Sequence, residues 1–320
     1  MVQALNQALA QEMERDPRVV VLGEDVGVDG GVFRVTDGLF QKFGGERVMD
    51  TPLAESGIIG VSIGMAAFGL RPVPEIQFLG FIYPAFNQII SHLARLRNRT
   101  RGRFTAPMVI RTPYGAGVRA LEHHSESMEA LFCQIPGLTV VVPSTPYEAK
   151  GLLIAAIRSD DPVIFLEPSR LYRAEKQDVP EEPYEIPLRH ARLVKEGQDL
   201  TIIAWGAMVP VVEKAAETAA QTGLSAEILD LRTLSPLDQD AIVGSVRKTG
   251  RALVVHEAPK TCGLGAEIAA LIGEKALLQL EAPVLRVTGP DITIPLPKTE
   301  DYYYLSADRV AGGIRKVMEF

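Results

Sequence analysis

This sequence of 320 residues is poor in cysteine, in tryptophan and in net positive charge. Its two cysteines, Cys133 and Cys262, cannot make a disulfide framework or a cysteine-based zinc site. The formal net charge of −7 argues against nucleic acid or an anionic membrane surface as the main partner. So few cysteines fit a reducing compartment, and we expect a cytoplasmic protein.

The sequence also lacks a long apolar run and the pattern of a leader peptide. No apolar run reaches the length of about 20 residues that a membrane-spanning helix needs. Residues 1–18 have no basic region followed by an apolar block, and acids outnumber their arginines, so neither a secretory signal nor a transit peptide is predicted. They predict an amphipathic helix with these apolar residues on one face: Val2, Leu5, Leu9 and Met13.

Short apolar runs alternate with helical patterns through the first half of the chain. The runs predict buried strands over residues 19–25, 71–78, 106–113, 138–144 and 162–168. Helices are predicted between them, over residues 57–70, 83–99 and 146–158. Strand–helix–strand alternation is typical of a parallel sheet covered by helices on both faces.

A stretch rich in proline and charge, residues 171–187, interrupts this alternation and is typical of a linker. Beyond it, strands are predicted over residues 199–206, 225–232, 251–258 and 283–289. Helices are predicted over residues 209–222, 238–248, 264–280 and 307–319. We therefore predict an α/β protein of two domains, residues 1–178 and 197–320, joined by a linker over residues 179–196.

Polar and aromatic residues follow several strands of the first half, where parallel sheets bind their ligands. Glu24 and Asp25 end the first strand, and residues 51–55 follow an extended segment. Residues 77–83 and the loop 114–127 follow later strands. We expect all of them at one edge of the same sheet.

Glu55 lies where the extended segment 47–53 gives way to a helix of small residues. Two interpretations of this carboxylate are open. Its charge can stabilise the start of the helix, by a few tenths to about 1 kcal/mol. Alternatively it is a carboxylate in a dry site that exchanges a proton or a hydrogen bond with a ligand. The first role is the more common one at a helix start.

The stretch Glu122–Ser127, with the adjacent histidines His123 and His124, also has several interpretations. It can be a polar surface loop, or it can carry a histidine acid or base, since histidine changes charge near neutral pH. A metal site is disfavoured because adjacent histidines point apart in regular structure and no third histidine or cysteine has ligand spacing. The aromatic stretch Phe78–Tyr83 is either core or a wall that stacks a planar ring.

Other short motifs are weaker. Gly60–Gly64 matches the serine-hydrolase pattern G-x-S-x-G, but Ser62 falls inside a predicted helix, whereas the nucleophile needs a strand directly before it. A hydrolase that uses Ser62 is a remote alternative, and a non-catalytic α/β scaffold is another. Gly263–Gly265 lacks the third glycine of a dinucleotide fingerprint, and acidic residues make the loop Gly23–Gly31 unsuited to phosphate.

Taken in order along the chain, the longer motifs resemble one family. They are LGEDVG, DTPLAESGIIG, RPVPEIQFLGFIYPAF, HHSES, PSTPYEAKGLL, DDPVIFLEP, DLRTLSPLD and LEAPVLRVTGPD. The chain is similar over essentially its whole length to the β subunits of thiamine-diphosphate-dependent 2-oxo acid dehydrogenases. The resemblance implies a transketolase-like pyrimidine-binding domain, a transketolase-like C-terminal domain, and oxidative decarboxylation with reductive acylation of lipoyl-lysine. Bacterial pyruvate-specific members are most similar, and the branched-chain enzyme is the alternative.

The resemblance also implies roles for single residues. Glu55 matches a glutamate that hydrogen-bonds a ring nitrogen of the cofactor's aminopyrimidine and so favours the tautomer that removes the thiazolium proton. His124 matches a histidine that contacts the substrate and takes part in acyl transfer, and His123 is the weaker candidate. Further cofactor contacts are expected from Glu24, Leu53, Ala54, Gln77 and Phe81. Substrate contacts are expected from Phe81, Ile82, Tyr83, Pro84 and His124.

Metal ions and partners are implied in the same way. A structural potassium ion would be held mostly by the backbone carbonyls of Ala106, Met108, Val109, Ala156, Ser159 and Asp161. The family anchors the diphosphate through Mg²⁺ on a Gly-Asp-Gly motif, and this chain has no such motif. We therefore expect an α subunit to bind Mg²⁺ and the diphosphate in an α2β2 heterotetramer. The C-terminal domain would serve assembly and dock the acyltransferase component.

Overall fold

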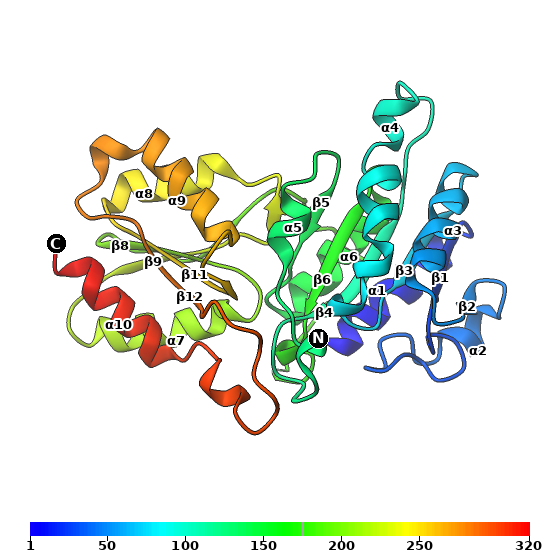
Figure 1. Cartoon of the computed structure of the whole chain (residues 1–320), viewed down its shortest axis with the longest axis horizontal. Helices are drawn as coiled ribbons and strands as arrows, with labels where there is room; N and C mark the ends of the chain where they lie inside the picture. The colour runs from blue at the N-terminus through cyan, green and yellow to red at the C-terminus, as the bar shows by residue number, and fades with distance from the viewer. Residues whose placement is uncertain (175) are drawn as a thin grey trace.

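The computed structural model describes residues 1–174 and 176–320, which form two α/β units arranged along the longest axis of the molecule (Figure 1). The strands of the first sheet are β1 (Val19–Gly23), β2 (Val48–Asp50), β3 (Arg71–Glu75), β4 (Val109–Tyr114), β5 (Thr139–Val141), β6 (Val163–Pro168) and β10 (Thr233–Ser235). Those of the second are β7 (Arg192–Lys195), β8 (Leu200–Ala204), β9 (Ala226–Asp230), β11 (Ala252–Pro259) and β12 (Leu285–Gly289).

The two sheets are mainly parallel, as predicted. The first has seven strands in the order β10-β5-β6-β4-β3-β1-β2, and the second has five in the order β12-β11-β8-β9-β7. The antiparallel pairs are β10 with β5 and β7 with β9, and each places an antiparallel strand at one edge of its sheet. The strand β10 comes from the second half of the sequence but joins the first sheet, so the two units share backbone hydrogen bonds.

Helices cover both faces of the second sheet (Figure 1). Those of the first unit are α1 (Val2–Arg15), α2 (Leu39–Phe43), α3 (Glu55–Ala67), α4 (Leu96–Arg99), α5 (Glu129–Cys133) and α6 (Pro146–Arg158). Those of the second are α7 (Met208–Ala220), α8 (Gln239–Thr249), α9 (Leu264–Lys275) and α10 (Ala307–Met318). Among the described residues, none of the helices combines the length and hydropathy needed to cross a membrane.

The helix predicted over residues 83–99 is wrong as a single α-helix. The segment contains a 3₁₀ turn η2 (Tyr83–Ala85), a π-helix η3 (Gln88–Leu93) and α4. Ile89 and Leu93, at the spacing that also shares one face of an α-helix, are both fully buried. Apolar spacing indicates a helical twist but does not distinguish α from π hydrogen bonding, which packing decides here.

Residues 180–186 of the proline-rich stretch pack on the first unit. The side chain of Lys150, on α6, is fully buried, and its ammonium donates to the three consecutive carbonyls of residues 180–182. The amide of Ile186 donates to the carbonyl of Gly151. The end of the expected linker is not a loop, because residues 192–195 form the edge strand β7. The sequence signal of β7 is weak, since the strand has only four residues, RLVK, and two of them are charged.

A buried polar contact joins the two units. The indole of Trp205 donates to a carboxylate oxygen of Glu129, on α5, at 3.2 Å. Its ring stacks on His256, on β11, with centroids 5.2 Å apart. Burial raises the pKa of Glu129 to about 7, although hydrogen bonds from its own backbone and from Trp205 oppose the rise.

We expect Glu129→Gln to become more stable, relative to the unchanged protein, as pH rises from 5 to 8. The native pKa of Glu129, about 7, exceeds the ordinary value of 4.5, so the native state holds this proton more tightly than the unfolded chain. The stability from this group is complete below pH 4.5 and is lost as pH rises through 7, by about 3 kcal/mol. Urea unfolding at both pH values measures it, with exposed Glu46→Gln as the control. A difference between Glu129→Gln and the parent that does not change with pH contradicts the expectation.

Candidate active site

Two mostly buried carboxylates lie close together at the carboxyl ends of the first sheet. Glu24 directly follows β1, and Glu55 is the first residue of α3; each is 8% exposed. Burial raises the pKa of Glu24, and the charges of Glu55 and Asp25 raise it further. The carboxylate of Glu55 makes no hydrogen bond to another described residue. The side chain is mostly buried, but its carboxylate oxygens are not among the fully buried unpaired atoms, so a ligand can reach them.

The local structure explains why Glu55 lies at this point. The strand β2 ends at Asp50, and the chain stays extended through Pro52, which disfavours a helix at the preceding residue. The helix α3 then begins without a side-chain cap, and Glu55 is the acid in its first turn. The helix-start role is therefore real, because an acid here offsets the dipole. This role does not exclude a second one, because the carboxylate makes no hydrogen bond to another described residue.

A second contact fixes the neighbouring strand ends. The side-chain amide of Gln77 donates to a carboxylate oxygen of Asp25 at 2.9 Å. The strands β1 and β3 are parallel neighbours, with Gly23 opposite Glu75, so their following residues emerge side by side. The amide of Gly27 donates to the carboxylate of Asp50 at 2.6 Å. The glycine-rich loop therefore binds a carboxylate of the same chain, as expected for a loop that is not a phosphate cradle.

Histidine and aromatic rings form a cluster next to Gln77. The ring of His124 lies 4.5 Å from that of Phe78 and 5.1 Å from that of Phe81, edge to face in both cases. The ring of His123 lies 4.7 Å from that of His124, which the sequence argument did not expect. The two residues belong to a 3₁₀ turn, η4 (Glu122–His124), where neighbouring side chains do not diverge as they do in a strand. The Nδ1 atom of His124 is buried and has no partner among the described residues.

A glycine allows this cluster to form. Gly80 lies in the 3₁₀ turn η1 (Leu79–Phe81), which packs directly on η4. A Cβ atom at position 80 would lie 2.1 Å from the carbonyl oxygen of His123. No side chain fits there, so the approach of the aromatic turn to the histidine turn depends on glycine.

The other residues predicted to contact the cofactor or the substrate differ in their exposure. Leu53, Ala54 and Pro84 are exposed, and Leu53 is 79% exposed. Tyr83 is half exposed, and its hydroxyl donates to Glu126 at 2.8 Å. Burial and that hydrogen bond raise the pKa of Tyr83 to about 12.

Ile82 is fully buried in the core, backbone included, so it supports the site from behind. Three further hydroxyls belong to segments that the sequence selected, but were not named as site residues. They are buried at the site without partners among the described residues. They belong to Thr51, Ser125 and Ser127. Only burial reveals them, because serine and threonine are ordinary loop residues.

Ser62 is not a nucleophile. It is fully buried within α3, and its hydroxyl donates to the carbonyl of Ile58 at 2.8 Å. A helical residue precedes it, whereas a nucleophile elbow has a strand there. Within the described part of the chain, no group of three or more His, Cys, Asp or Glu side chains is placed to hold a metal ion.

The six carbonyls expected around potassium lie on neighbouring segments. Residues 106–109 lead into β4, and residues 156–161 span the end of α6 and the turn toward β6, the strand next to β4. The guanidinium of Arg71 donates to the carbonyls of Ile157 and Ser159, at 2.9 Å each. A side-chain cation thus already occupies the helix terminus, and the residues fit potassium only in part.

Two parallel-sheet units in one chain, with the candidate site at the strand ends of the first, define a transketolase-like protein. Residues 1–175 match the family model "Transketolase, pyrimidine binding domain", and residues 189–310 match "Transketolase, C-terminal domain". A solved structure described as a split gene transketolase, inactive beta4 tetramer, has the same fold. Its TM-score is 0.81 at 24% identity, over 99% of this chain and 97% of that one.

Within this class, the chain belongs to the family of pyruvate dehydrogenase E1 component β subunits. The relative from Acholeplasma laidlawii is 55% identical over 99% of this chain and 97% of its own length. The relative from Bacillus subtilis (strain 168) is 52% identical over 100% of this chain and 98% of its own length. The relative from Staphylococcus aureus (strain N315) is 50% identical over the same shares. All three are named pyruvate dehydrogenase E1 component subunit beta.

Proposed function

We propose that this chain is the β subunit of a thiamine-diphosphate-dependent pyruvate dehydrogenase. With an α subunit it decarboxylates pyruvate oxidatively and acetylates the lipoyl-lysine of an acyltransferase component, whose disulfide is the acceptor. The observation that carries the proposal is the row of neighbouring side chains, linked by charge, hydrogen bond and ring packing, from Glu55 to His124. The charge of Glu55 raises the pKa of Glu24. Asp25 accepts a hydrogen bond from Gln77, and the ring of Phe78 packs edge to face on His124. Adjacent residues in the chain join these contacts at one edge of the sheet.

The side chains at this edge fit the pyrimidine half of thiamine diphosphate. When bound, the cofactor supplies the carbon nucleophile that attacks the 2-oxo group. The free carboxylate of Glu55 accepts a hydrogen bond from a ring nitrogen and holds a proton there. No described residue hydrogen-bonds this carboxylate, and its oxygens are not fully buried, so a ligand donor can pair with it. Phe81 lines the ring, and the imidazole of His124 would contact the substrate and the acyl acceptor.

An exposed apolar face on α3 supports an α-subunit partner. Small and apolar residues follow the helix on its exposed side, at helical spacing: Gly57, Val61, Gly64 and Phe68. Phe68 is 91% exposed and Val61 is 55% exposed, and Leu53 is exposed at the other end of the helix. Exposed apolar faces of this kind mark protein interfaces. We propose that the α subunit covers this face in an α2β2 heterotetramer and brings Mg²⁺ and the diphosphate site next to Glu55.

Activity with and without an α subunit tests the proposal. The chain would be expressed alone and with the α subunit of the same organism, and decarboxylation of pyruvate and of 3-methyl-2-oxobutanoate followed with an artificial electron acceptor. We expect activity only in the complex and a higher kcat/KM for pyruvate. Full activity of the isolated chain contradicts the proposal, and preference for the branched substrate favours the branched-chain alternative. Ser62→Ala is expected to keep its activity.

Gly80→Ala is expected to lower acetyl transfer to lipoyl-lysine by roughly 10²-fold. The methyl group must move the carbonyl of His123, and a displacement of about 1 Å at a reacting group costs this much. The assay compares acetylation of a lipoyl domain with decarboxylation measured with an artificial acceptor. Gly244→Ala is the matched control, because a Cβ atom there, in α8 and away from the α3 face, meets nothing within 4 Å. Equal activity of Gly80→Ala and the parent would show that the position of η4 does not matter.

Potassium remains a separate prediction of the proposed function. Bound potassium should raise the melting temperature of the complex in KCl above that in NaCl at equal ionic strength, because a ligand that binds only the native state stabilises it. The measurement is thermal unfolding in both salts. Identical melting temperatures would leave Arg71 as the cation at this helix terminus.

A further inference from the structure

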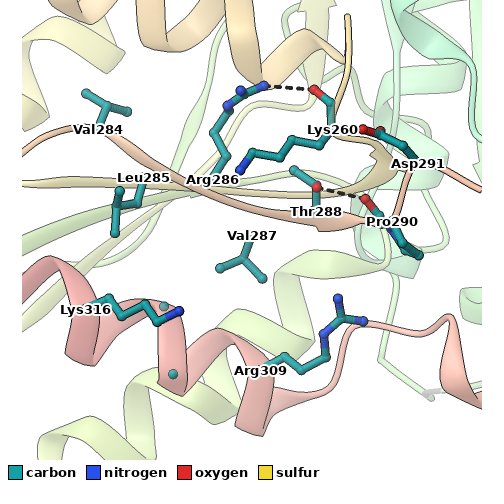
Figure 2. Close-up of a pocket in the computed structure, with 13 residues that line it drawn as sticks. Lys260, Val284, Leu285, Arg286, Val287, Thr288, Pro290, Asp291, Arg309 and Lys316 are labelled. Atoms are coloured by element: carbon teal, nitrogen blue, oxygen red, sulfur yellow. Dashed lines mark hydrogen bonds between the residues drawn. The ribbon is translucent and has the colours of Figure 1, made fainter.

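A groove of about 660 Å³ lies along the outer edge of β12, far from the candidate active site in the sequence (Figure 2). Its floor is the strand itself and the turn after it, residues 284–291, and α10 forms one wall. Two features of this groove have no part in the proposed function. One is the free edge of the strand, and the other is a set of four cations: Lys260, Arg286, Arg309 and Lys316.

The edge of β12 is open to a further strand. In the order β12-β11-β8-β9-β7 it is the outermost strand, and it pairs only with β11, in parallel. One row of its backbone N–H and C=O groups therefore has no strand partner among the described residues. Such a row is a template for another extended chain. The opposite edge, β7, has a different character because it is antiparallel to its neighbour.

The four cations lie on both sides of that edge. Arg286 projects to one face of the sheet, where its guanidinium donates to the carbonyl of Lys260 at 2.9 Å. Val287 projects to the other face and packs against Gly313 of α10, the helix that carries Arg309 and Lys316. Figure 2 shows Arg286 and Lys260 on one side of the strand and Arg309 and Lys316 on the other.

None of these four cations forms an ion pair with a carboxylate of the described residues. Among the described residues, the guanidinium of Arg309 donates only to the backbone carbonyls of residues 303 and 304. Asp291 also lines the groove, but its carboxylate is engaged by the amide and hydroxyl of Thr261, at 2.9 and 2.7 Å. Four cations against this one carboxylate, whose pKa the hydrogen bonds from Thr261 and the charge of Lys260 lower, leave net positive charge here on a chain whose net charge is −7. The groove therefore selects a partner that is acidic.

We propose that β12 binds an acidic, extended segment of a partner protein by strand addition. Successive side chains of an added strand point to opposite faces of the sheet. Acidic residues on one face of the segment would meet Arg286 and Lys260, and those on the other would meet Arg309 and Lys316. Because the strand separates the two pairs of cations, they do not converge on one small anion. The proposal stands independently of the catalytic function.

A designed peptide tests the strand addition. The probe is a fluorescein-labelled peptide of sequence EEVEEVEE with blocked ends, added to the assembled protein at low salt. We expect saturable binding that weakens as salt is raised. One control peptide has alternate backbone nitrogens methylated, which keeps the charge but removes strand hydrogen bonds. A second has glutamine in place of glutamate. Both are expected to bind at least about tenfold more weakly.

Protein variants identify the groove. Arg286→Gln combined with Lys316→Gln removes one cation from each face. The double variant should bind the probe peptide at least about tenfold more weakly than the parent. The matched control is Lys195→Gln with Lys214→Gln, which removes two exposed cations of the same domain, Lys195 being on the opposite edge strand. The affinity of the control variant for the probe peptide should lie within about twofold of that of the parent. Hydrogen exchange of residues 285–289 should slow when the peptide binds the parent, which checks the site without any substitution.

Several outcomes overturn the proposal. Equal binding of the N-methylated peptide would show that charge alone is responsible. Unchanged binding to the Arg286→Gln, Lys316→Gln variant would place the peptide elsewhere. Displacement by inorganic phosphate at constant ionic strength would indicate a small-anion site. A change of subunit assembly in that variant, measured by sedimentation, would show that the edge is an interface between subunits of the enzyme.

Discussion

Replacing Glu55 by glutamine is expected to lower the kcat of pyruvate decarboxylation by roughly 10²–10⁴-fold, while assembly with the α subunit is retained. Glutamine keeps the shape of the side chain and can still accept a hydrogen bond. It cannot hold the positive charge that develops on the ring nitrogen when a proton is exchanged. The Glu55 side chain is mostly buried and no described residue hydrogen-bonds its carboxylate, so the loss is expected in the chemical step rather than in stability.

Exchange of the thiazolium proton of bound thiamine diphosphate measures this step directly. In the α2β2 complex, Glu55→Gln should slow that exchange in deuterated buffer by a factor similar to the loss in kcat. Glu46→Gln is the control, because Glu46 is an exposed acid of the same domain. An unchanged exchange rate in Glu55→Gln would remove this carboxylate from the mechanism. Loss of assembly would assign it the helix-start role alone.

Arg111→Met is expected to destabilise the first domain by about 3–5 kcal/mol. The guanidinium is 1% exposed and lies in the middle of the first sheet. It donates to both carboxylate oxygens of Glu167, at 2.7 and 2.9 Å, and to Glu75 at 2.9 Å. Tyr172 donates a further hydrogen bond to Glu167 at 2.6 Å. Without the arginine, two carboxylates would remain buried with no countercharge.

Urea unfolding of Arg111→Met, compared with two further variants, isolates the effect of the buried charges. Glu75→Gln and Glu167→Gln, added to Arg111→Met, should recover part of the lost stability because neutral amides replace the unpaired charges. Arg103→Met, at an exposed position of the same domain, should change stability little. Equal stability of Arg111→Met and the triple variant would show that packing, and not charge, determines the cost.

The buried ion pairs of Arg111 with Glu75 and Glu167 also support the candidate active site. Burial raises the pKa of Glu75, and the charge of Glu167 adds to the rise, while Arg111 opposes it. Glu75 ends β3, two residues before Gln77, and a Cβ atom on Gly31 of the neighbouring loop would lie 3.5 Å from its carboxylate. The buried ion pairs therefore fix the strand ends from which Glu24, Gln77 and Phe78 project. We expect Arg111→Met to weaken cofactor binding as well as stability.

The architecture followed from local patterns. Residues 146–158 carry a helical period, proline in the first turn and Thr145 before it, and the helix α6 has these bounds with Thr145 as its cap. Uninterrupted apolar runs predicted the buried parallel strands, because such strands are covered on both faces. The rule that ligands bind at the carboxyl ends of strands then selected the segments of Glu24, Glu55, Gln77 and His124 before their contacts were known.

Other features depend on contacts between distant residues. The sequence contains Gly80, but its role depends on a carbonyl more than forty residues away in the chain, at position 123. The adjacent histidines share one cluster because the turn η4 is 3₁₀ rather than regular strand. The strand β10 joins the sheet of the other unit, which no periodicity indicates. In each case packing across the molecule chose among backbone conformations of similar local energy.

By itself the sequence determined the α/β class, most helices and strands, and which strand ends carry the reactive side chains. These depend on periodicity and on proline and glycine, which act within a few residues. Only the tertiary structure decided that Glu55 is buried without a partner, that His124 meets Phe78, and that Arg286 and Lys316 flank one free strand edge. Burial and charge pairing arise from segments distant in sequence, so no local pattern specifies them.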